Sequence, residues 1–97
     1  MKRVRYADIG HKSMLQCPVC GHLIKYSSEK QPFRKPRAAD LAKHISFKSP
    51  HDEKHKKWII EKFGEFPIDY EIIRKYLEET EYEVTGELLG VKIYRPI

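Results

Sequence analysis

The sequence predicts an α+β fold, with a Cys knuckle on a short β-hairpin, about three helices and a C-terminal β-hairpin. Three observations lead to this fold class. Two cysteines stand two residues apart between short apolar segments, three later segments show the apolar spacing of helices, and the tail carries apolar residues around glycines. A chain of 97 residues is expected to form a single domain, over residues 1–97.

The first third of the chain is predicted to supply short strands. The roughly alternating segment 2–9 (KRVRYADI) favours a first strand. Residues 14–16 and 22–26 flank the cysteines and are expected to form the two strands of the knuckle hairpin. Residues 27–36 are polar and basic and contain two prolines, which indicates a loop.

Three helices are predicted after this loop. Residues 36–47 carry a buried stripe at helical spacing, formed by Ala38, Leu41, Ala42 and Ile45. A second helix is expected to run to about residue 63, with Ser49 as its cap and Pro50 in its first position. A third is expected over residues 68–79, and residues 82–94, with glycines at 86 and 90, predict the final β-hairpin.

The charge of the chain is unevenly distributed. The net charge is +5, yet residues 63–97 hold eight acidic and four basic side chains, so the positive excess lies in residues 1–62. A basic region beside a recognition element is the electrostatic pattern of nucleic-acid binding. The alternative is a solvated surface that only favours solubility.

The composition also bears on the compartment. We expect a cytoplasmic protein, because no apolar run could span a membrane and the basic N-terminus lacks the apolar stretch of a signal peptide. Two cysteines in that compartment more often bind metal or do redox chemistry than form a disulfide. The absence of Asn, with many Lys and Glu, is typical of thermophilic proteins.

The segment Cys17-Pro-Val-Cys20-Gly21 is a chelating turn. Two thiolates at this spacing can bind one ion, and the glycine lets the backbone curl so that N–H groups point at sulfur. A closed zinc site needs four ligands, and the chain has no further cysteine. Two histidines must therefore complete it, from the set His11, His22, His44, His51 and His55. We predict one structural zinc ion per chain, which would stabilise so small a domain.

His44 is the first choice among the histidines, because Leu41-x-x-His44 puts an apolar residue and a ligand on one helical face. His51 and His55 lie four residues apart on one face, and either can supply the fourth ligand. His55 is preferred because it precedes Trp58, which is expected to be buried. A site that uses His51 and His55 without His44 is the third arrangement. The two remaining histidines are expected in loops, one of them next to the knuckle.

The pair Cys17-x2-Cys20, followed by Leu-x2-His44, resembles the Cys2His2 zinc finger. The stretch LAKHISFKSPHDEKHKKWI resembles a variant of that finger in small archaeal and archaeal-virus proteins, with ten residues between the histidines and Trp three after the second. His44, His55 and Trp58 match this spacing, which further favours His55. On this basis we expect a zinc-finger region of about 13–63 and a helix plus β-hairpin extension of about 64–97.

The resemblance implies a DNA-binding transcription regulator. In ordinary fingers the residue before the helix and the third and sixth within it face bases. Counting back from His44 as the seventh gives Arg37 for guanine, Asp40 for cytosine, and Lys43 for guanine or phosphate. Phosphate contacts are expected from the other basic residues of this region, Arg34, Lys35, Lys48, Lys54, Lys56 and Lys57. For each residue the alternative is a solvated helix face.

A single finger reads about three base pairs, so a longer footprint needs a second element. A homodimer or the basic N-terminal arm is expected to supply it. Two other functions remain open. The acidic tail with its tyrosines suits a zinc-scaffolded protein–protein interaction module, and the basic loop with Tyr26 and Phe33 suits RNA binding.

Enzymatic activity is not expected. A redox Cys-x2-Cys pair needs to open a helix after a strand, whereas Gly21-His22-Leu23-Ile24 does not have the character of a helix start. A catalytic zinc would need an open coordination position and a nearby general acid or base, and no such pair stands out. We also expect neither a small-molecule substrate nor a membrane partner.

Overall fold

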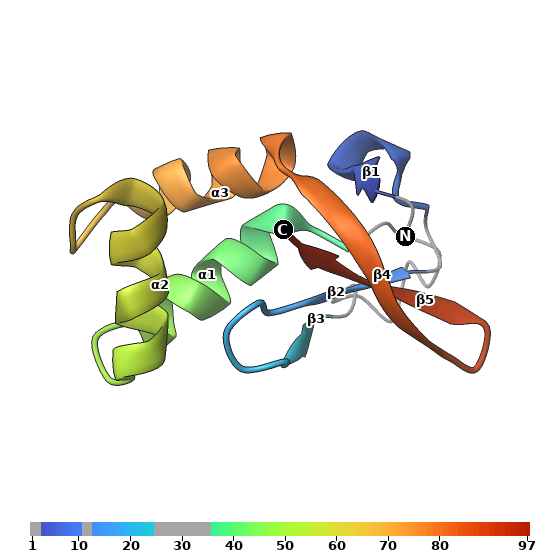
Figure 1. The fold of residues 1–97 in the computed structure, drawn as a ribbon, viewed down its shortest axis with the longest axis horizontal. Helices are drawn as coiled ribbons and strands as arrows, with labels where there is room; N and C mark the ends of the chain where they lie inside the picture. Colours follow the sequence, from blue (N-terminus) through green and yellow to red (C-terminus); the bar gives the residue numbers. More distant parts are fainter. Residues whose placement is uncertain (1–2, 11–12, 25–35) are drawn as a thin grey trace.

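The computed structural model describes residues 3–10, 13–24 and 36–97. It confirms the α+β class, with three helices and a C-terminal β-hairpin (Figure 1). In chain order the elements are β1 (Arg3–Arg5), a 3-10 turn (Tyr6–Asp8), β2 (Ser13–Gln16), β3 (Leu23–Ile24), α1 (Ala38–Lys48), α2 (Glu53–Phe63), α3 (Tyr70–Glu79), β4 (Glu81–Leu88) and β5 (Val91–Pro96).

The strands form one mixed five-stranded sheet in the order β1-β4-β5-β2-β3. The C-terminal hairpin occupies the middle of the sheet, because β4 pairs antiparallel with β1 and β5 pairs parallel with β2. The strand that leads into the knuckle is thus held by the last strand of the chain, with Leu15 opposite Tyr94. Figure 1 shows the helices gathered at one side of the molecule and the hairpin β4–β5 extending away from them.

The core lies between the sheet and the helices. Its buried side chains come from every helix and from strands β2 to β5, namely Leu15, Ile24, Leu41, Ala42, Ile45, Ile59, Ile73, Leu77, Tyr82 and Tyr94. Helix α1 contributes most of its inward face and is fully covered there by its neighbours. Within the ranges that the structure describes, no helix has both the length and the apolar character needed to cross a membrane.

The break between the first two helices differs from the predicted one. We expected Ser49 to cap the second helix, but Ser49 ends α1 in helical conformation and its hydroxyl donates to the Ser46 carbonyl (2.9 Å). Pro50 has no N–H with which to continue the helix. Asp52 is the actual cap of α2, and its Oδ1 accepts from the Lys54 N–H (3.3 Å). A carboxylate at this position also suits the positive end of the helix dipole.

Other element ends also shift by a few residues. The predicted first strand is shorter and turns at Tyr6, whose hydroxyl donates to the Pro36 carbonyl (2.9 Å) and accepts from the Ala38 N–H (3.0 Å). The third helix begins at Tyr70 because Asp69 caps it by accepting from the Glu71 N–H (2.9 Å). The predicted loop 27–36 falls almost wholly outside the described residues.

The tip of the C-terminal hairpin is a two-residue turn with an unfavourable residue. Leu89 (φ 51°) and Gly90 (φ 82°) both have left-handed backbone, as a tight turn between twisted strands requires. Asn, Asp and Gly are the residues that tolerate this conformation. In a leucine the Cβ atom lies too close to the following carbonyl oxygen, which is unfavourable. Burial of the side chain does not offset this strain, because the Leu89 side chain is 97% exposed.

We therefore predict that Leu89→Asn stabilises the protein by about 0.5–1 kcal/mol, because asparagine accepts left-handed backbone more readily. This corresponds to a melting temperature a few degrees higher. Thermal unfolding followed by circular dichroism measures it. The matched control is Leu88→Asn, at an exposed β4 position with ordinary backbone, where no gain is expected. A lower melting temperature for Leu89→Asn would contradict the strain argument.

Candidate metal centre

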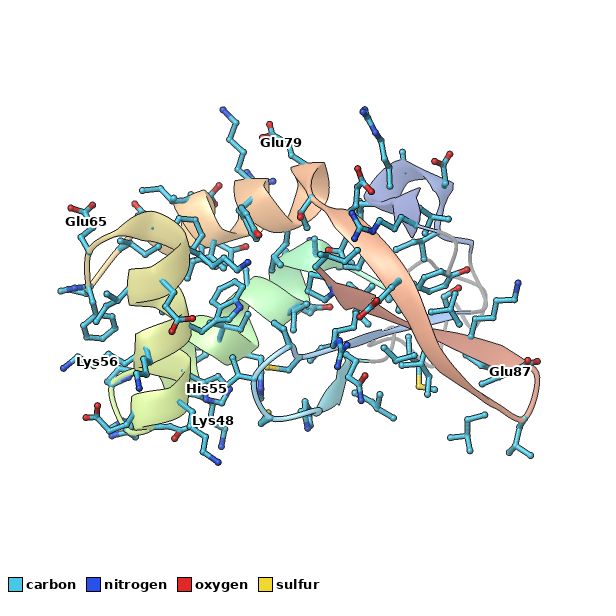
Figure 2. All side chains as sticks on the ribbon, in the orientation of Figure 1. Lys48, His55, Lys56, Glu65, Glu79 and Glu87 are labelled. Carbon is cyan, nitrogen blue, oxygen red and sulfur yellow. The ribbon has the colours of Figure 1, made fainter. Side chains whose placement is uncertain are left out.

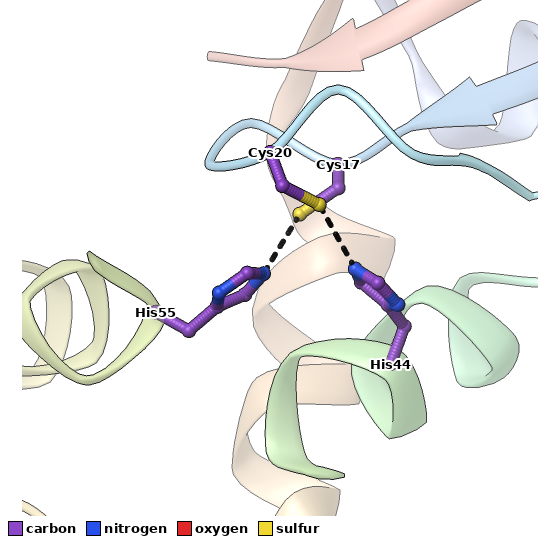
Figure 3. Close-up of side chains that lie close together, drawn as sticks. All are labelled: Cys17, Cys20, His44 and His55. Atoms are coloured by element: carbon purple, nitrogen blue, oxygen red, sulfur yellow. Dashed lines mark hydrogen bonds between the residues drawn. The ribbon is translucent and has the colours of Figure 1, made fainter. Parts of the chain in front are cut away.

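Four side chains that the sequence singles out lie together at one point of the fold. The donor atoms of Cys17, Cys20, His44 and His55 all lie within 4.8 Å of one another. Figure 3 shows the two cysteines on the turn after β2, His44 on α1 and His55 on α2, all pointing to the same centre. The arrangement is suited to hold one metal ion.

The knuckle is shaped by backbone hydrogen bonds. The Cys17 N–H donates to the His22 carbonyl (2.9 Å), which closes the β2–β3 hairpin, and the Gly21 N–H donates to the Cys17 carbonyl (3.0 Å). Gly21 has left-handed backbone (φ 79°), which a side chain would resist. The N–H groups of Val19 and Cys20 bond to the Cys17 sulfur. These two N–H bonds favour the thiolate form of Cys17, in opposition to the effect of its burial.

Helix α1 brings His44 to the exposed side of the cluster. Its Nε2 lies 3.3 Å from the Cys20 Sγ, and Cys20 is itself exposed. The His44 ring stacks on the ring of His22, with centroids 4.7 Å apart and planes only 12° from parallel. His22 is held by the knuckle, so this contact joins the helix to the hairpin and limits the rotation of His44.

The break at Pro50 is what allows His55 to reach the same centre. In one continuous helix, residues eleven positions apart would be separated by about 16 Å along the axis, too far to share one ion. Because α1 ends at Lys48 and α2 starts again at Glu53, His55 comes back toward the knuckle. Its Nε2 lies 3.6 Å from the Cys17 Sγ, and its side chain is only 2% exposed.

Asp52 fixes the orientation of His55. Its Oδ2 accepts a hydrogen bond from His55 Nδ1, while Oδ1 caps helix α2. A carboxylate can only accept, so Nδ1 must carry the hydrogen and the lone pair of Nε2 is left facing the sulfur of Cys17. This carboxylate–histidine pair is the usual support of a metal-bound imidazole. The hydrogen bond from His55 also lowers the pKa of Asp52.

The protonation of the cluster reflects its burial. Burial raises the pKa of Cys17 to about 11, against the two N–H bonds of the knuckle, which lower it. Burial also lowers the pKa of His44 to about 4, with smaller contributions from His22, His55 and Lys48. The metal-free cluster thus holds a protonated thiol and a neutral imidazole. A cation would compensate the desolvation of the thiolate and accept the lone pair of the imidazole.

Two sulfur–nitrogen distances in the cluster are those expected around a tetrahedral zinc ion. Zinc binds sulfur at about 2.3 Å and imidazole nitrogen at about 2.0–2.1 Å, so two such donors at the tetrahedral angle lie about 3.5 Å apart. The observed sulfur–nitrogen distances are 3.6 Å for Cys17 with His55 and 3.3 Å for Cys20 with His44. Two thiolates with two imidazoles is also a donor set that zinc prefers.

The other candidate ligands lie elsewhere. His51, the alternative to His55, sits in the turn before α2 and is exposed, and it is not part of the cluster. His11 lies outside the described residues. The site therefore combines the helix-borne histidines of α1 and α2, and the arrangement with His51 and without His44 is not the one that the fold brings together.

The candidate nucleic-acid contacts fall on two helices. Arg37 precedes α1 and is exposed, as is Lys43. Asp40 is half-buried, and its Oδ2 is buried without a hydrogen-bond partner among the described residues. Among the expected phosphate contacts on these helices, Lys48, Lys54 and Lys57 are exposed, whereas Lys56 is half-buried with its Nζ 5.3 Å from the Phe66 ring centroid. Arg34 and Lys35 are not among the described residues.

Sequence reasoning missed Asp52. The signal was present, since an aspartate three residues before a helical histidine can cap the helix and reach the ring on the same face. We expected the helix start at Ser49-Pro50 instead, because this pair matches the pattern of a helix cap followed by a first helical residue equally well.

Comparison with known proteins identified no family for this chain. Neither protein-family models nor curated proteins nor solved structures gave a match to the chain.

We predict that Asp52→Ala lowers metal affinity by about 10- to 100-fold, the usual effect of removing the partner of a bound imidazole. Competition titration with a chromogenic chelator measures this. Asp52→Ala also removes a helix cap, so the matched control is Asp69→Ala, which removes the equivalent cap of α3 away from the cluster. Each variant should lose about 1 kcal/mol of stability through its missing helix cap. Equal metal affinities for the two variants would disprove the role of Asp52.

Metal affinity should rise with pH. The pKa of Cys17, raised to about 11, means that an incoming ion must displace a proton from this thiol at neutral pH. Between about pH 6 and pH 8 the apparent affinity should therefore rise about tenfold per pH unit for each proton displaced. The pKa of His44, lowered to about 4, means that this imidazole adds little to the slope.

The same chelator competition, repeated at several pH values, tests this slope. His51→Ala, which alters an exposed histidine outside the cluster, is expected to show the same slope as the native chain. An affinity that does not change over this range would show that a thiol is not among the ligands.

Proposed function

We propose that this chain is a zinc-dependent nucleic-acid-binding protein, most simply a DNA-binding transcription regulator. The observation that carries the proposal is the cluster of Cys17, Cys20, His44 and His55, which joins a β-hairpin to two helices. Such a cluster is built for structure, because four protein donors fill a tetrahedral ion and leave no open position for a substrate. We accordingly propose no enzymatic activity.

The likeness to a zinc finger supports the nucleic-acid part of the proposal. Helix α1 begins at Ala38, so Arg37 stands just before it and Lys43 is its sixth residue. These are two of the base-facing positions of a docked finger helix, and both side chains are exposed. Arg37 could therefore meet guanine and Lys43 guanine or phosphate. The half-buried carboxylate of Asp40 makes it the weakest of the three candidate positions.

The distribution of charge also favours a nucleic acid. Lys48 and Lys56 lie toward the α2 end of the molecule, where Glu65 also lies, whereas Glu87 lies on the hairpin at the opposite end (Figure 2). The segment 63–97, which forms α3 and the hairpin, carries twice as many acidic as basic side chains. A phosphate backbone would therefore approach α1 and α2 and avoid the hairpin.

A protein-interaction module is the second candidate function. It is favoured by apolar side chains that stand exposed in the acidic extension, at Ile72 on α3 and at Leu88 and Leu89 on the hairpin. This function needs the same zinc site but no affinity for nucleic acid. A homodimer formed through this surface would also extend the footprint on DNA. RNA remains a candidate partner beside DNA.

The proposal predicts salt-dependent binding of the zinc-loaded protein to DNA. Replacing Lys54 or Lys57 with Ala should weaken binding to every sequence alike and reduce the slope of log affinity against log salt by about one. Arg37→Ala should instead change the preference among sequences. Fluorescence anisotropy on labelled oligonucleotides at several salt concentrations measures both effects.

The matched control is Lys75→Ala, which removes an exposed lysine from α3 in the acidic part of the chain. This variant should bind like the native protein. Zinc-loaded protein that binds no DNA or RNA at low salt would refute the nucleic-acid function. That result would leave the interaction module as the explanation of the zinc site.

A further inference from the structure

Phe47 stands apart from the other aromatic residues that the structure describes. Its side chain is 75% exposed, whereas each of the other phenylalanine, tyrosine and tryptophan side chains in the described ranges is buried or half-buried. Trp58 and Phe63, for example, pack with Tyr76 in edge-to-face contacts against the core. The fold thus covers the other described aromatic rings at least in part, whereas the ring of Phe47 is exposed to solvent.

The position of Phe47 is set by the geometry of α1. The buried face of this helix contains Leu41, Ala42 and Ile45. Phe47 lies on the opposite face, one turn beyond Lys43, since residues four apart on a helix are neighbours. It therefore belongs to the same outward stripe as a residue expected to contact a base or a phosphate.

The exposed charged side chains of α1 itself are basic. Lys43 and Lys48 are exposed on the same helix as Phe47, whereas the acidic side chain of this helix, Asp40, is half-buried. The segment 51–54 that follows carries Lys54 together with Asp52 and Glu53, so it adds no positive excess. An exposed ring among cations complements a ligand with flat apolar faces and negative charge.

We propose that Phe47 is a stacking platform for an unpaired base of a single-stranded nucleic acid, flanked by lysines that bind its phosphates. This inference rests on the proposed nucleic-acid binding and adds a single-stranded form of the ligand to the duplex that Arg37 and Lys43 would read. In a duplex the grooves offer base edges, while the faces of the bases are stacked on one another. A ring gains from a base face only where that face is free, as in a single strand.

The zinc-loaded full chain tests this with one short labelled oligonucleotide, used as a single strand and annealed to its complement. Phe47→Ala should lower affinity for the single strand about tenfold, or about 1.4 kcal/mol. Phe47→Leu should lose as much, because it keeps apolar surface but no ring. Phe47→Trp should retain the affinity. The salt slope should stay unchanged in all three variants, because no cation is removed.

Two controls separate a contact from a folding defect. Val84→Ala changes another exposed apolar side chain, one on strand β4 in the acidic part of the chain, and it should leave the affinity unchanged. Melting temperature and zinc content should match the native protein in every Phe47 variant, since the side chain lies outside the core.

Several outcomes would overturn the inference while leaving the proposed function intact. These are equal affinities for native protein and Phe47→Ala, full affinity in Phe47→Leu, or an equal loss on single strand and duplex. A native dimer that Phe47→Ala converts to a monomer in sedimentation would show that the ring covers a second copy instead. If the native protein binds neither form at low salt, the proposed function itself fails.

Discussion

The convergence of four donor atoms, two sulfurs and two imidazole nitrogens, is the constraint on which the rest of the structure depends. The knuckle, α1 and α2 each contribute donor atoms to this one cluster. Without a cation, this junction holds a desolvated thiol at Cys17, whose pKa is raised, beside the imidazole of His44, whose lowered pKa keeps it from taking a proton. A bound ion would turn the same groups into the strongest link in the domain.

The way the histidines reach this centre explains the local features around it. Pro50 ends α1, which lets His55 return on a second helix instead of being carried along the first. Asp52 then serves two purposes with its two oxygens, since it starts α2 and orients the ring of His55. On the exposed side of the cluster, the stacking of His22 on His44 likewise fixes the orientation of the His44 ring. Each of the two histidine ligands thus has a second contact that fixes the orientation of its ring.

Local patterns in the sequence predicted part of this fold and part of the metal centre. Short-range spacing indicated the knuckle, His44 and the three helices, and the offset of Trp58 favoured His55 over His51. The sequence could not show that β5 lies beside β2, because a parallel pair formed by the two ends of the chain leaves no local signal. Nor could it show which of two good caps starts α2, or that Phe47 is left exposed, since both depend on what the rest of the fold already occupies.

The most direct test of the central claim is metal content and thermal unfolding, with and without a chelator, for the native chain, His55→Ala and His51→Ala. The account predicts one zinc ion per chain in the native protein and in His51→Ala, and a large loss of stability when the ion is removed, since structural zinc contributes on the order of 10 kcal/mol. His55→Ala should retain little zinc. Unchanged melting after chelation, or full zinc content in His55→Ala, would contradict it.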